Sequence, residues 1–301
     1  MSTVLIAGGT GLIGTSLSRM LVSKGYNVII LTRSAKPSQG NISYSKWDIN
    51  KSIIDKGVIE QSDHIIHIAG AGVADKRWTD KRKKEIVDSR IKSSELLINA
   101  LKETNNRVQS VVSASAIGWY GPDQKGKIFT ETDPPNNDFL GETCRLWEQS
   151  IEPVKHLGKR LVILRTGIVL SNEGGAFVEF KKPMKAGIAA ILGSGKQVIS
   201  WIHVDDLCRM YIDGIETNNL SGVYNAVTDH VTNKELILCT ARARKKAFIP
   251  IHVPEFVLKL MLGEMSIEVL KSTTVDNSKI KHAGFKYLYP TLDAALNELV
   301  S

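Results

Sequence analysis

The feature that most constrains the fold of this chain is a glycine-rich loop close to its start, residues 8–14 (GGTGLIG). The loop follows a short apolar and β-branched run, Thr3–Ala7 (TVLIA), which is typical of a buried parallel strand. From about Leu12, apolar residues recur at helical spacing, and Gly25 is placed to end that helix. A strand, a Gly-x-x-Gly-x-x-Gly turn and a helix in this order predict a domain that binds a dinucleotide.

Each glycine of the loop has an expected task. Gly8 permits the tight turn, Gly11 lets the backbone approach a pyrophosphate, and Gly14 lets the helix lie close to the strand. The free N–H groups and the positive end of the helix then attract the anion. The candidate phosphate-binding residues are therefore Gly8, Thr10, Gly11, Leu12, Ile13 and Gly14.

Strands and helices alternate beyond this first unit. Further strands are predicted at residues 27–31, 64–68, 110–113 and 161–164, and helices at residues 80–101 and 142–155. Strands that alternate with helices at this spacing indicate βαβ units and a parallel sheet. The fold class is therefore α/β, with a Rossmann-type doubly wound parallel sheet.

The pattern changes after about Leu170, which suggests a second lobe. Residues 171–200 are rich in glycine and basic residues and show no clear alternation. A strand and a helix follow at residues 201–215, with Asp205 or Asp206 placed as the N-cap of that helix. We expect a dinucleotide-binding domain at residues 1–170, completed by about 201–240. A smaller, mainly C-terminal substrate lobe would take residues 171–200 and 241–301.

The end of the second strand indicates which dinucleotide is bound. A carboxylate that would hold a ribose 2′-hydroxyl is absent there, and Arg33 stands 19 positions after Gly14. A guanidinium at this place favours a 2′-phosphate and thus NADP over NAD, although a surface arginine that merely follows a strand would look the same. Asp48, after another possible strand, would accept a hydrogen bond from the adenine amino group or simply form a turn.

Composition and charge exclude several classes of partner. The formal net charge of +8 is concentrated near residues 76–84 and 242–246, without interleaved aromatic residues, so we expect solvated helix faces and no nucleic acid. No apolar run approaches the roughly 18 residues of a membrane helix. The cysteines show no pairing pattern, which argues against a metal centre and for the cytoplasm or a processed organelle protein. They are Cys144, Cys208 and Cys239.

Several separated motifs resemble one protein family. They include residues 67–72 (HIAGAG), 113–121 (SASAIGWYG), 84–90 (KEIVDSR), 193–195 (GSG) with 201–207 (WIHVDDL), and 262–265 (LGEM). With the glycine loop, they resemble the extended short-chain dehydrogenase/reductases, in particular the atypical branch of epimerase family proteins related to nucleoside-diphosphate-sugar epimerases. The resemblance runs from Val4 to about Val300, and it implies a Rossmann domain, a small substrate lobe and NADP as cofactor.

The resemblance also implies cofactor contacts that spacing alone does not predict. Thr32 and Arg33 would meet the 2′-phosphate, and the backbone of Ile68, Ala69 and Gly70 would lie beside the ribose and pyrophosphate. Further contacts would come from Glu85, Arg90 and Val169. Taken alone, the first two of these are typical of a solvated salt-bridged helix, and the third of a core strand.

The resemblance breaks where the family carries its catalytic pair. Working members have Tyr-x-x-x-Lys on one helix, a spacing that places phenol and ammonium one turn apart so that the cation lowers the phenol pKa. Here the pair becomes Phe139 and Thr143 in one register, and Leu140 and Cys144 in the next. The usual acid–base mechanism therefore cannot be transferred to this chain.

Two catalytic candidates remain. Ser115 matches the family's substrate-orienting hydroxyl, although a serine there also often caps a turn, and Tyr120 is the nearest phenol in sequence. Cys144 is more typical of a buried small residue than of a nucleophile, and His203 of a residue that orders a strand end.

Two function hypotheses follow. The first is an NADP-dependent epimerase or oxidoreductase that acts on a small molecule such as a nucleotide sugar. The second is a non-catalytic NADP(H)-binding protein that reports redox state. The sequence leaves the oligomeric state open.

Overall fold

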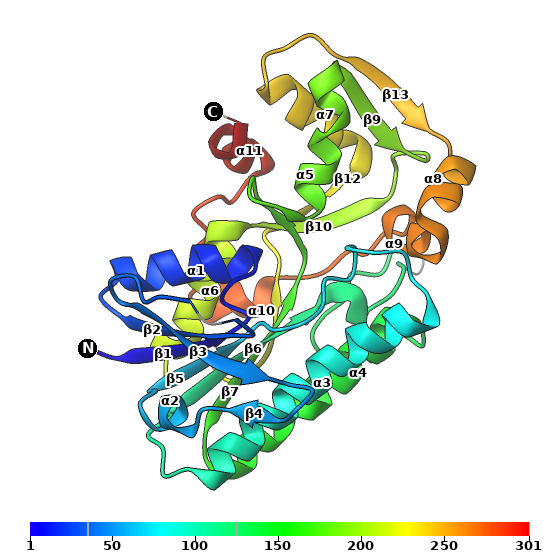
Figure 1. Cartoon of the computed structure of the whole chain (residues 1–301). Helices are drawn as coiled ribbons and strands as arrows, with labels where there is room; N and C mark the ends of the chain where they lie inside the picture. The colour runs from blue at the N-terminus through cyan, green and yellow to red at the C-terminus, as the bar shows by residue number, and fades with distance from the viewer. Residues whose placement is uncertain (35, 124–125, 301) are drawn as a thin grey trace.

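The core of the protein is one twisted sheet of eight strands (Figure 1). The protein is described here by a computed structural model, which covers residues 1–34, 36–123 and 126–300. In spatial order the strands are β11 (Gly222–Ala226), β7 (Arg160–Thr166), β6 (Ser110–Ala116), β5 (His64–His67), β1 (Thr3–Ala7), β2 (Asn27–Thr32), β3 (Ile42–Asp48) and β4 (Ile53–Ile54). All neighbours pair in parallel except β3 and β4, which are antiparallel.

This strand order confirms the predicted doubly wound sheet. The chain runs outward from β1 through β2 to β3 and then returns, so that β5 pairs with the other side of β1. Crossovers on opposite sides diverge at such a switch point and leave a crevice beyond the carboxyl ends of the strands. The loop at residues 8–14 follows β1 and therefore lies at this crevice.

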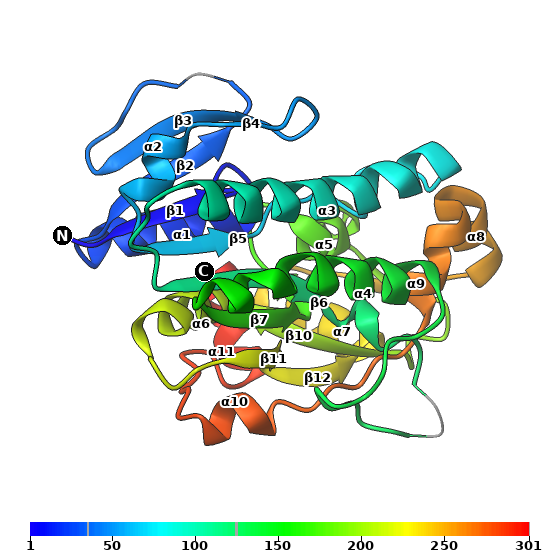
Figure 2. The ribbon, with the colours of Figure 1, turned by 90° about the horizontal axis from the view of Figure 1, so that it is seen from below.

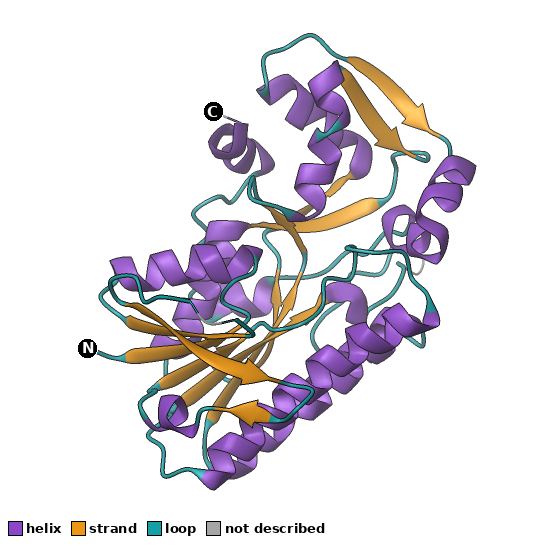
Figure 3. Ribbon diagram, viewed as in Figure 1, coloured by secondary structure: helices purple, strands orange, loops and turns teal. Residues whose placement is uncertain are grey.

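Helices cover both faces of the sheet, as Figures 2 and 3 show. One face carries α1 (Leu12–Ser23), α6 (Val204–Glu216) and α10 (Ser278–His282), and the other α2 (Lys56–Glu60), α3 (Asp80–Glu103) and α4 (Phe139–Ile151). Alternate residues of β1 pack against the two helix layers. Val4 and Ile6 pack in the same cluster as Leu17 and Leu207, whereas Leu5 packs with the α3 side. Both faces of the sheet are buried, and this explains why the strand sequences are continuous apolar runs.

The predicted helix at residues 142–155 differs from the structure at both ends. The helix α4 begins at Phe139, where the side chain of Asp138 accepts a hydrogen bond from the Gly141 N–H as N-cap. It ends at Ile151, and a 3₁₀ segment, η2 (Glu152–Leu157), follows. Pro153 explains the change, because it lacks the N–H that would continue the α-helical ladder.

The second lobe contains two small sheets and several helices. A three-stranded sheet joins β12 (Asp229–Thr232), β10 (Val198–His203) and β8 (Ile168–Leu170), and a two-stranded sheet joins β13 (Ile249–Val253) and β9 (Ile188–Leu192). The helices are α5 (Gly175–Lys181), α7 (Asn233–Ala243), α8 (Glu255–Leu262), α9 (Ser266–Leu270) and α11 (Leu292–Val300). Although most of α7 lies within residues 201–240, it packs on β9 and α11. Residue 301, the end of the expected lobe, lies outside the described residues.

The predicted N-cap of α6 was wrong. The cap is His203, whose Nδ1 accepts a hydrogen bond from the Asp205 N–H at 3.2 Å. Asp206 instead accepts hydrogen bonds from the backbone N–H groups of Leu288 and Tyr289, at 2.7 and 2.9 Å. The carboxylate of Asp206 is therefore used by a segment more than eighty residues away in sequence. Local capping propensity gives no sign of this contact.

Among the described residues, we find no helix with the length and apolar character needed to cross a membrane.

Candidate functional site

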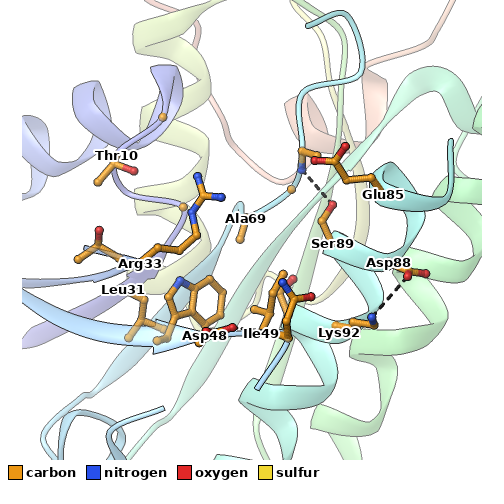
Figure 4. Close-up of a pocket in the computed structure, with 18 of the residues that line it drawn as sticks. Thr10, Leu31, Arg33, Asp48, Ile49, Ala69, Glu85, Asp88, Ser89 and Lys92 are labelled. Carbon is orange, nitrogen blue, oxygen red and sulfur yellow. Dashed lines mark hydrogen bonds and ion pairs between the residues drawn. The ribbon is translucent and has the colours of Figure 1, made fainter. Parts of the chain in front are cut away.

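A cavity of about 720 Å³ opens at the switch point of the sheet. Four segments wall it: the β1–α1 loop, the ends of β2 and β3, the chain that follows β5, and one side of α3 (Figure 4). Ten of the residues predicted to bind the cofactor line it, namely Gly8, Thr10, Gly11, Thr32, Arg33, Asp48, Ile68, Ala69, Gly70 and Glu85. Leu12, Ile13, Gly14, Arg90 and Val169 do not reach its surface.

The glycine loop has the geometry of a phosphate cradle. Gly8 has φ of +97°, and a Cβ there would lie 2.8 Å from the Ile68 carbonyl and the Ala69 nitrogen. At Gly14 a Cβ would overlap the backbone of Gly8 and Gly9, so the start of α1 lies against the turn that directly follows β1, whereas the sequence predicted close packing on the strand itself. The N-cap residue of α1 is Gly11, which has no side chain to bond the free N–H groups of the first turn. These groups fit the pyrophosphate of a dinucleotide.

The ends of β2 and β3 form the opposite end of the cavity. Arg33 is exposed, and Figure 4 shows its guanidinium extending over the pocket. Thr32 is buried, and its Oγ1 accepts a hydrogen bond from the Ser34 N–H. Asp48 lines the cavity, and its Oδ1 accepts hydrogen bonds from Asn50 N and Lys51 N, which is the turn that the sequence offered as one of two alternatives. A guanidinium beside a pocket of this kind fits a phosphate ester.

Arg90 lies outside the pocket and contacts the chain after β5, which forms one of its walls. Its Nη1 donates to the Ala71 carbonyl at 3.0 Å and to the Ile86 carbonyl at 2.9 Å, and its guanidinium lies 4.8 Å from the Trp147 ring centroid. Burial lowers the pKa of Arg90 to about 10. Ser89 adds a second link, since its Oγ accepts a hydrogen bond from the Ala71 N–H (Figure 4). These two α3 residues therefore position the chain that follows β5.

The remaining predicted cofactor contacts lie in different surroundings. Glu85 faces the pocket and forms a 2.8 Å ion pair with Arg82, which lowers the pKa of the Glu85 carboxyl. Val169 lies in β8, paired with Ile202 of β10 and packed against the main core.

The two catalytic candidates belong to one buried polar network. Ser115 Oγ donates to Glu148 Oε1 at 2.6 Å, and Glu148 forms two hydrogen bonds with the Arg165 guanidinium, at 2.8 and 2.9 Å. The same guanidinium donates to the Tyr120 hydroxyl at 3.0 Å, which in turn donates to Asn225 Oδ1 at 2.6 Å. All five side chains are buried.

Glu148, Arg165 and Asn225 were not predicted from the sequence. One signal was available, because Arg165 stands in the apolar strand run LVILRT. A charge inside a buried strand requires a buried partner of opposite charge. Nothing in the sequence indicates which carboxylate provides it.

Burial governs the ionisation of Tyr120. It raises the pKa of the phenol to about 12, although the adjacent Arg165 charge opposes the shift. The ring stacks on Phe129 with centroids 5.2 Å apart. Tyr120 is therefore a neutral phenol at physiological pH.

The helix positions that would hold the family's Tyr/Lys pair are used for packing. Phe139 packs edge-on against Trp78, with ring centroids 4.8 Å apart, and Thr143 Oγ1 donates to the Phe139 carbonyl. Cys144 is buried, which raises the pKa of its thiol to about 11. None of these three side chains is suited to proton transfer at neutral pH.

Comparisons with known proteins agree with this fold and pocket. The model of the NAD dependent epimerase/dehydratase family matches residues 4–226, and a domain of unknown function, DUF1731, matches residues 253–299. The chain therefore belongs to the NAD dependent epimerase/dehydratase family. This membership confirms the resemblance to the atypical extended short-chain dehydrogenase/reductases.

Particular relatives cover the whole chain. The epimerase family protein SSP1921 of Staphylococcus saprophyticus is 36% identical over 307 residues, which span all of both chains. Among solved structures, the human epimerase family protein SDR39U1 with NADPH has a TM-score of 0.87 at 27% identity, over 99% of each chain. A nucleoside-diphosphate sugar epimerase from Corynebacterium glutamicum has a TM-score of 0.79 at 28% identity, over 99% of this chain and 58% of that one.

Proposed function

We propose that this protein is an NADP-dependent epimerase or oxidoreductase that acts on a small molecule. The observation that carries the proposal is the pocket itself, where the glycine cradle at the start of α1 and the Arg33 guanidinium border one cavity. A nicotinamide dinucleotide with an additional phosphate ester matches both features.

Three observations support NADP over NAD. Arg33 lines the pocket where a carboxylate would be expected for NAD. Lys36, Lys81 and Lys84 also border the cavity and add to its positive charge. The related human protein SDR39U1 was solved with NADPH, although other proteins of this fold, such as MoeE5 at 20% identity, were solved with NAD.

The chemistry rests on hydride exchange at the nicotinamide ring, which the coenzyme supplies when bound. Because Ser115 donates its proton to Glu148, its oxygen lone pairs remain to accept a hydrogen bond from a substrate hydroxyl. Tyr120, whose pKa burial raises and whose proton is donated to Asn225, would orient polar groups as a neutral phenol and would not act as a base. The related Corynebacterium protein is named a nucleoside-diphosphate sugar epimerase, so we propose nucleotide sugars as the first substrate class to test.

We also propose a reducing compartment such as the cytoplasm. Cys144, Cys208 and Cys239 are all free thiols, and the first two are buried. Burial raises the pKa of the Cys144 thiol, so the reactive thiolate is scarce at neutral pH.

The cofactor proposal is tested by Arg33→Asp. The substitution replaces a favourable charge beside the phosphate ester with a repulsive one, so we expect NADP(H) affinity to fall by about 100-fold and NAD(H) affinity to change by less than about 5-fold. Titration calorimetry with both coenzymes measures the two effects. Lys102→Asp, on an exposed turn of α3, changes the net charge equally and should leave both affinities intact. Equal losses for NADP and NAD in Arg33→Asp would contradict the assignment.

Turnover is tested with the NADP(H)-loaded protein and a panel of nucleotide sugars and carbonyl compounds. We expect a change in nicotinamide absorbance or, for an epimerase that regenerates its cofactor, a new sugar epimer by NMR. Ser115→Ala should then lower the rate by roughly 100-fold. A rate equal to that of the unaltered protein would remove Ser115 from the reaction.

One observation favours a second function. Phe139 and Thr143 replace the usual acid–base pair, and both are committed to packing and backbone contacts. A non-catalytic protein that senses the NADP(H) redox state would retain the pocket without this pair. It would bind NADPH and NADP with clearly different affinities and leave the whole substrate panel unchanged.

A further inference from the structure

A second cavity lies in the second lobe, apart from the pocket at the switch point of the sheet. Its volume is about 240 Å³, and it shares no lining residue with that pocket. The described residues that line it are Lys181, Lys185, Arg244, Leu299 and Val300. Three of these five residues are basic and none is acidic. A hollow with such a lining attracts anions.

Three helical parts of the lobe meet at this cavity (Figure 1). Lys181 is the last residue of α5, Lys185 lies in the 3₁₀ segment η3 (Pro183–Ala186), and Arg244 directly follows α7. The last two residues of α11 complete the lining. Side chains of α5, α7 and α11 share one buried apolar cluster, so packing fixes these helices relative to one another.

The side chain of Lys181 is held in place by its neighbours. Its Nζ donates to Asn172 Oδ1, and Asn172 Nδ2 donates to the Leu299 carbonyl at 2.7 Å. The ammonium also lies 4.6 Å from the ring centroid of Phe177, which is fully buried. Burial and the nearby Arg244 charge lower the pKa of Lys181. The two cations therefore repel each other, and an anion between them would relieve the repulsion.

The surrounding protein supplies too little negative charge to neutralise the cavity. Among the residues that the structure describes, neither Lys185 nor Arg244 forms an ion pair, and the carboxylate of Glu179 pairs with Lys182 at 2.6 Å. The carboxyl end of α11 provides only about half an elementary charge. Three cations less this half charge leave more than two positive charges without an ion-pair partner.

We propose that this cavity binds a pyrophosphate group, either as free pyrophosphate or as the diphosphate of a nucleotide whose base stays outside. A volume of 240 Å³ equals roughly eight water molecules of about 30 Å³ each, enough for two linked phosphates but below the roughly 300 Å³ of sites that enclose larger ligands. Lysine and arginine bind phosphate oxygens through charge-assisted hydrogen bonds. Two linked phosphates reach more of the three cations than one phosphate does.

The arrangement of the charges favours a compact anion over a nucleic acid. The three cations converge on one hollow, whereas a duplex is bound by basic residues along an extended stripe. The site lies outside the coenzyme pocket, so the inference does not depend on the proposed function.

The test is calorimetric titration with sodium pyrophosphate at low ionic strength, with NADPH in excess so that the glycine loop is occupied. We expect one pyrophosphate per chain. Lys185→Gln should weaken binding by about 10-fold, and Lys185→Gln with Arg244→Gln by about 100-fold, because each removes a charge-assisted contact. The matched control is Lys246→Gln, at an exposed position outside the cavity, which should bind as the native protein does. Circular dichroism verifies that the variants are folded.

Two further anions identify the source of the pyrophosphate group. Inorganic phosphate should bind at least about 10-fold more weakly than pyrophosphate, because it reaches fewer cations. ADP that binds as tightly as pyrophosphate, and is lost in the same variants, would identify the diphosphate of a nucleotide. Weaker binding of ADP would identify free pyrophosphate.

Four results would overturn the proposal. They are the absence of saturable pyrophosphate binding, inorganic phosphate binding as tight as that of pyrophosphate, and equal losses in Lys185→Gln and Lys246→Gln, which would indicate diffuse charge and no site. The fourth is binding to phosphatidylserine-containing vesicles without binding to pyrophosphate, which would assign these basic residues to a membrane. Because the substitutions lie outside the coenzyme pocket, failure of NADPH binding leaves their effect on pyrophosphate measurable.

Discussion

At the scale of single residues, the glycine loop and the buried histidine beside it give the sharpest tests. Gly8 holds a positive φ and contacts the backbone of the chain after β5, while His67 ends β5 itself. Both residues have close neighbours: a Cβ at Gly8 would clash with the Ile68–Ala69 backbone, and the His67 ring is fully buried.

Gly8→Ala should destabilise the protein by at least about 2 kcal/mol and weaken NADP(H) binding. The new Cβ would combine an unfavourable positive φ with a backbone clash at Ile68 and Ala69. Gly25→Ala separates the two effects, since Gly25 has φ of +87° with no atom near the added Cβ, and should cost about 1 kcal/mol. Urea unfolding measures both. Equal costs at the two glycines would show that the contact with the Ile68–Ala69 backbone has no energetic weight.

His67 should make stability depend on pH. Its ring contacts Ser93 and Ser113 and is fully buried, and burial, aided by the nearby Arg90 charge, lowers its pKa from 6.5 to about 3. Between these values the unfolded chain binds a proton that the folded one does not. The contribution of His67 to the free energy of unfolding is therefore complete above about pH 6.5. It is lost as the pH falls toward 3, by an amount on the order of several kcal/mol.

The comparison of variants isolates this effect. Urea unfolding of His67→Gln from pH 7 to pH 4 should show a smaller loss than the native protein, whereas exposed His156→Gln should behave as the native protein does. Parallel pH profiles for all three would contradict the assignment.

At the scale of elements, α4 and β7 are joined by the buried pair Glu148–Arg165, and β6 joins them through Ser115. One carboxylate therefore joins three elements that follow one another along the chain. The α4 positions to which the resemblance assigns a proton-transfer pair carry packing residues here, and the α4 side chain that reaches β6 and β7 is Glu148.

Glu148→Gln should destabilise the protein by about 3–5 kcal/mol, because it leaves the Arg165 charge buried without a carboxylate. The matched change Glu142→Gln, on an exposed face of α4 where it meets Arg145, should cost less than about 1 kcal/mol. Replacing both partners, as in Glu148→Leu with Arg165→Met, should restore much of the loss. Chemical unfolding measures the series, and similar costs for Glu148→Gln and Glu142→Gln would refute the role of the pair.

At the scale of the whole molecule, the C-terminal segment is held to the Rossmann domain by Asp206. This fully buried carboxylate accepts two backbone hydrogen bonds from Leu288 and Tyr289 and pairs with Arg209. The neighbouring Asp205 is partly exposed and makes no comparable contact with that segment.

Asp206→Ala should cost about 2–4 kcal/mol and expose residues 283–291 to protease, since the part-buried N–H groups of Leu288 and Tyr289 lose their acceptor. Asp205→Ala should change stability by less than about 1 kcal/mol and leave the digestion pattern intact. Urea unfolding and limited proteolysis with mass spectrometry measure both variants. Protection of residues 283–291 in Asp206→Ala would show that other contacts hold the segment.

Local sequence is enough to specify those parts of the protein whose structure depends on near neighbours. The strand Thr3–Ala7, the loop at residues 8–14 and the helix that follows are specified by apolar spacing and glycine positions within some twenty residues. The alternation of such units is enough to predict a doubly wound sheet and a pocket at its switch point.

The pairing of distant groups follows from the folded arrangement of the elements and not from local sequence. The local sequence predicts Asp206 as a helix cap, but its carboxylate accepts hydrogen bonds from the backbone of residues 288 and 289. The Tyr120 hydroxyl donates to Asn225, 105 residues further along the chain. The physical reason is that a buried charge or hydroxyl requires a hydrogen-bond partner. Judged from the sequence alone, many polar residues of the chain could provide it. Chain folding selects one of them by bringing it within about 3 Å, a choice that no local pattern encodes.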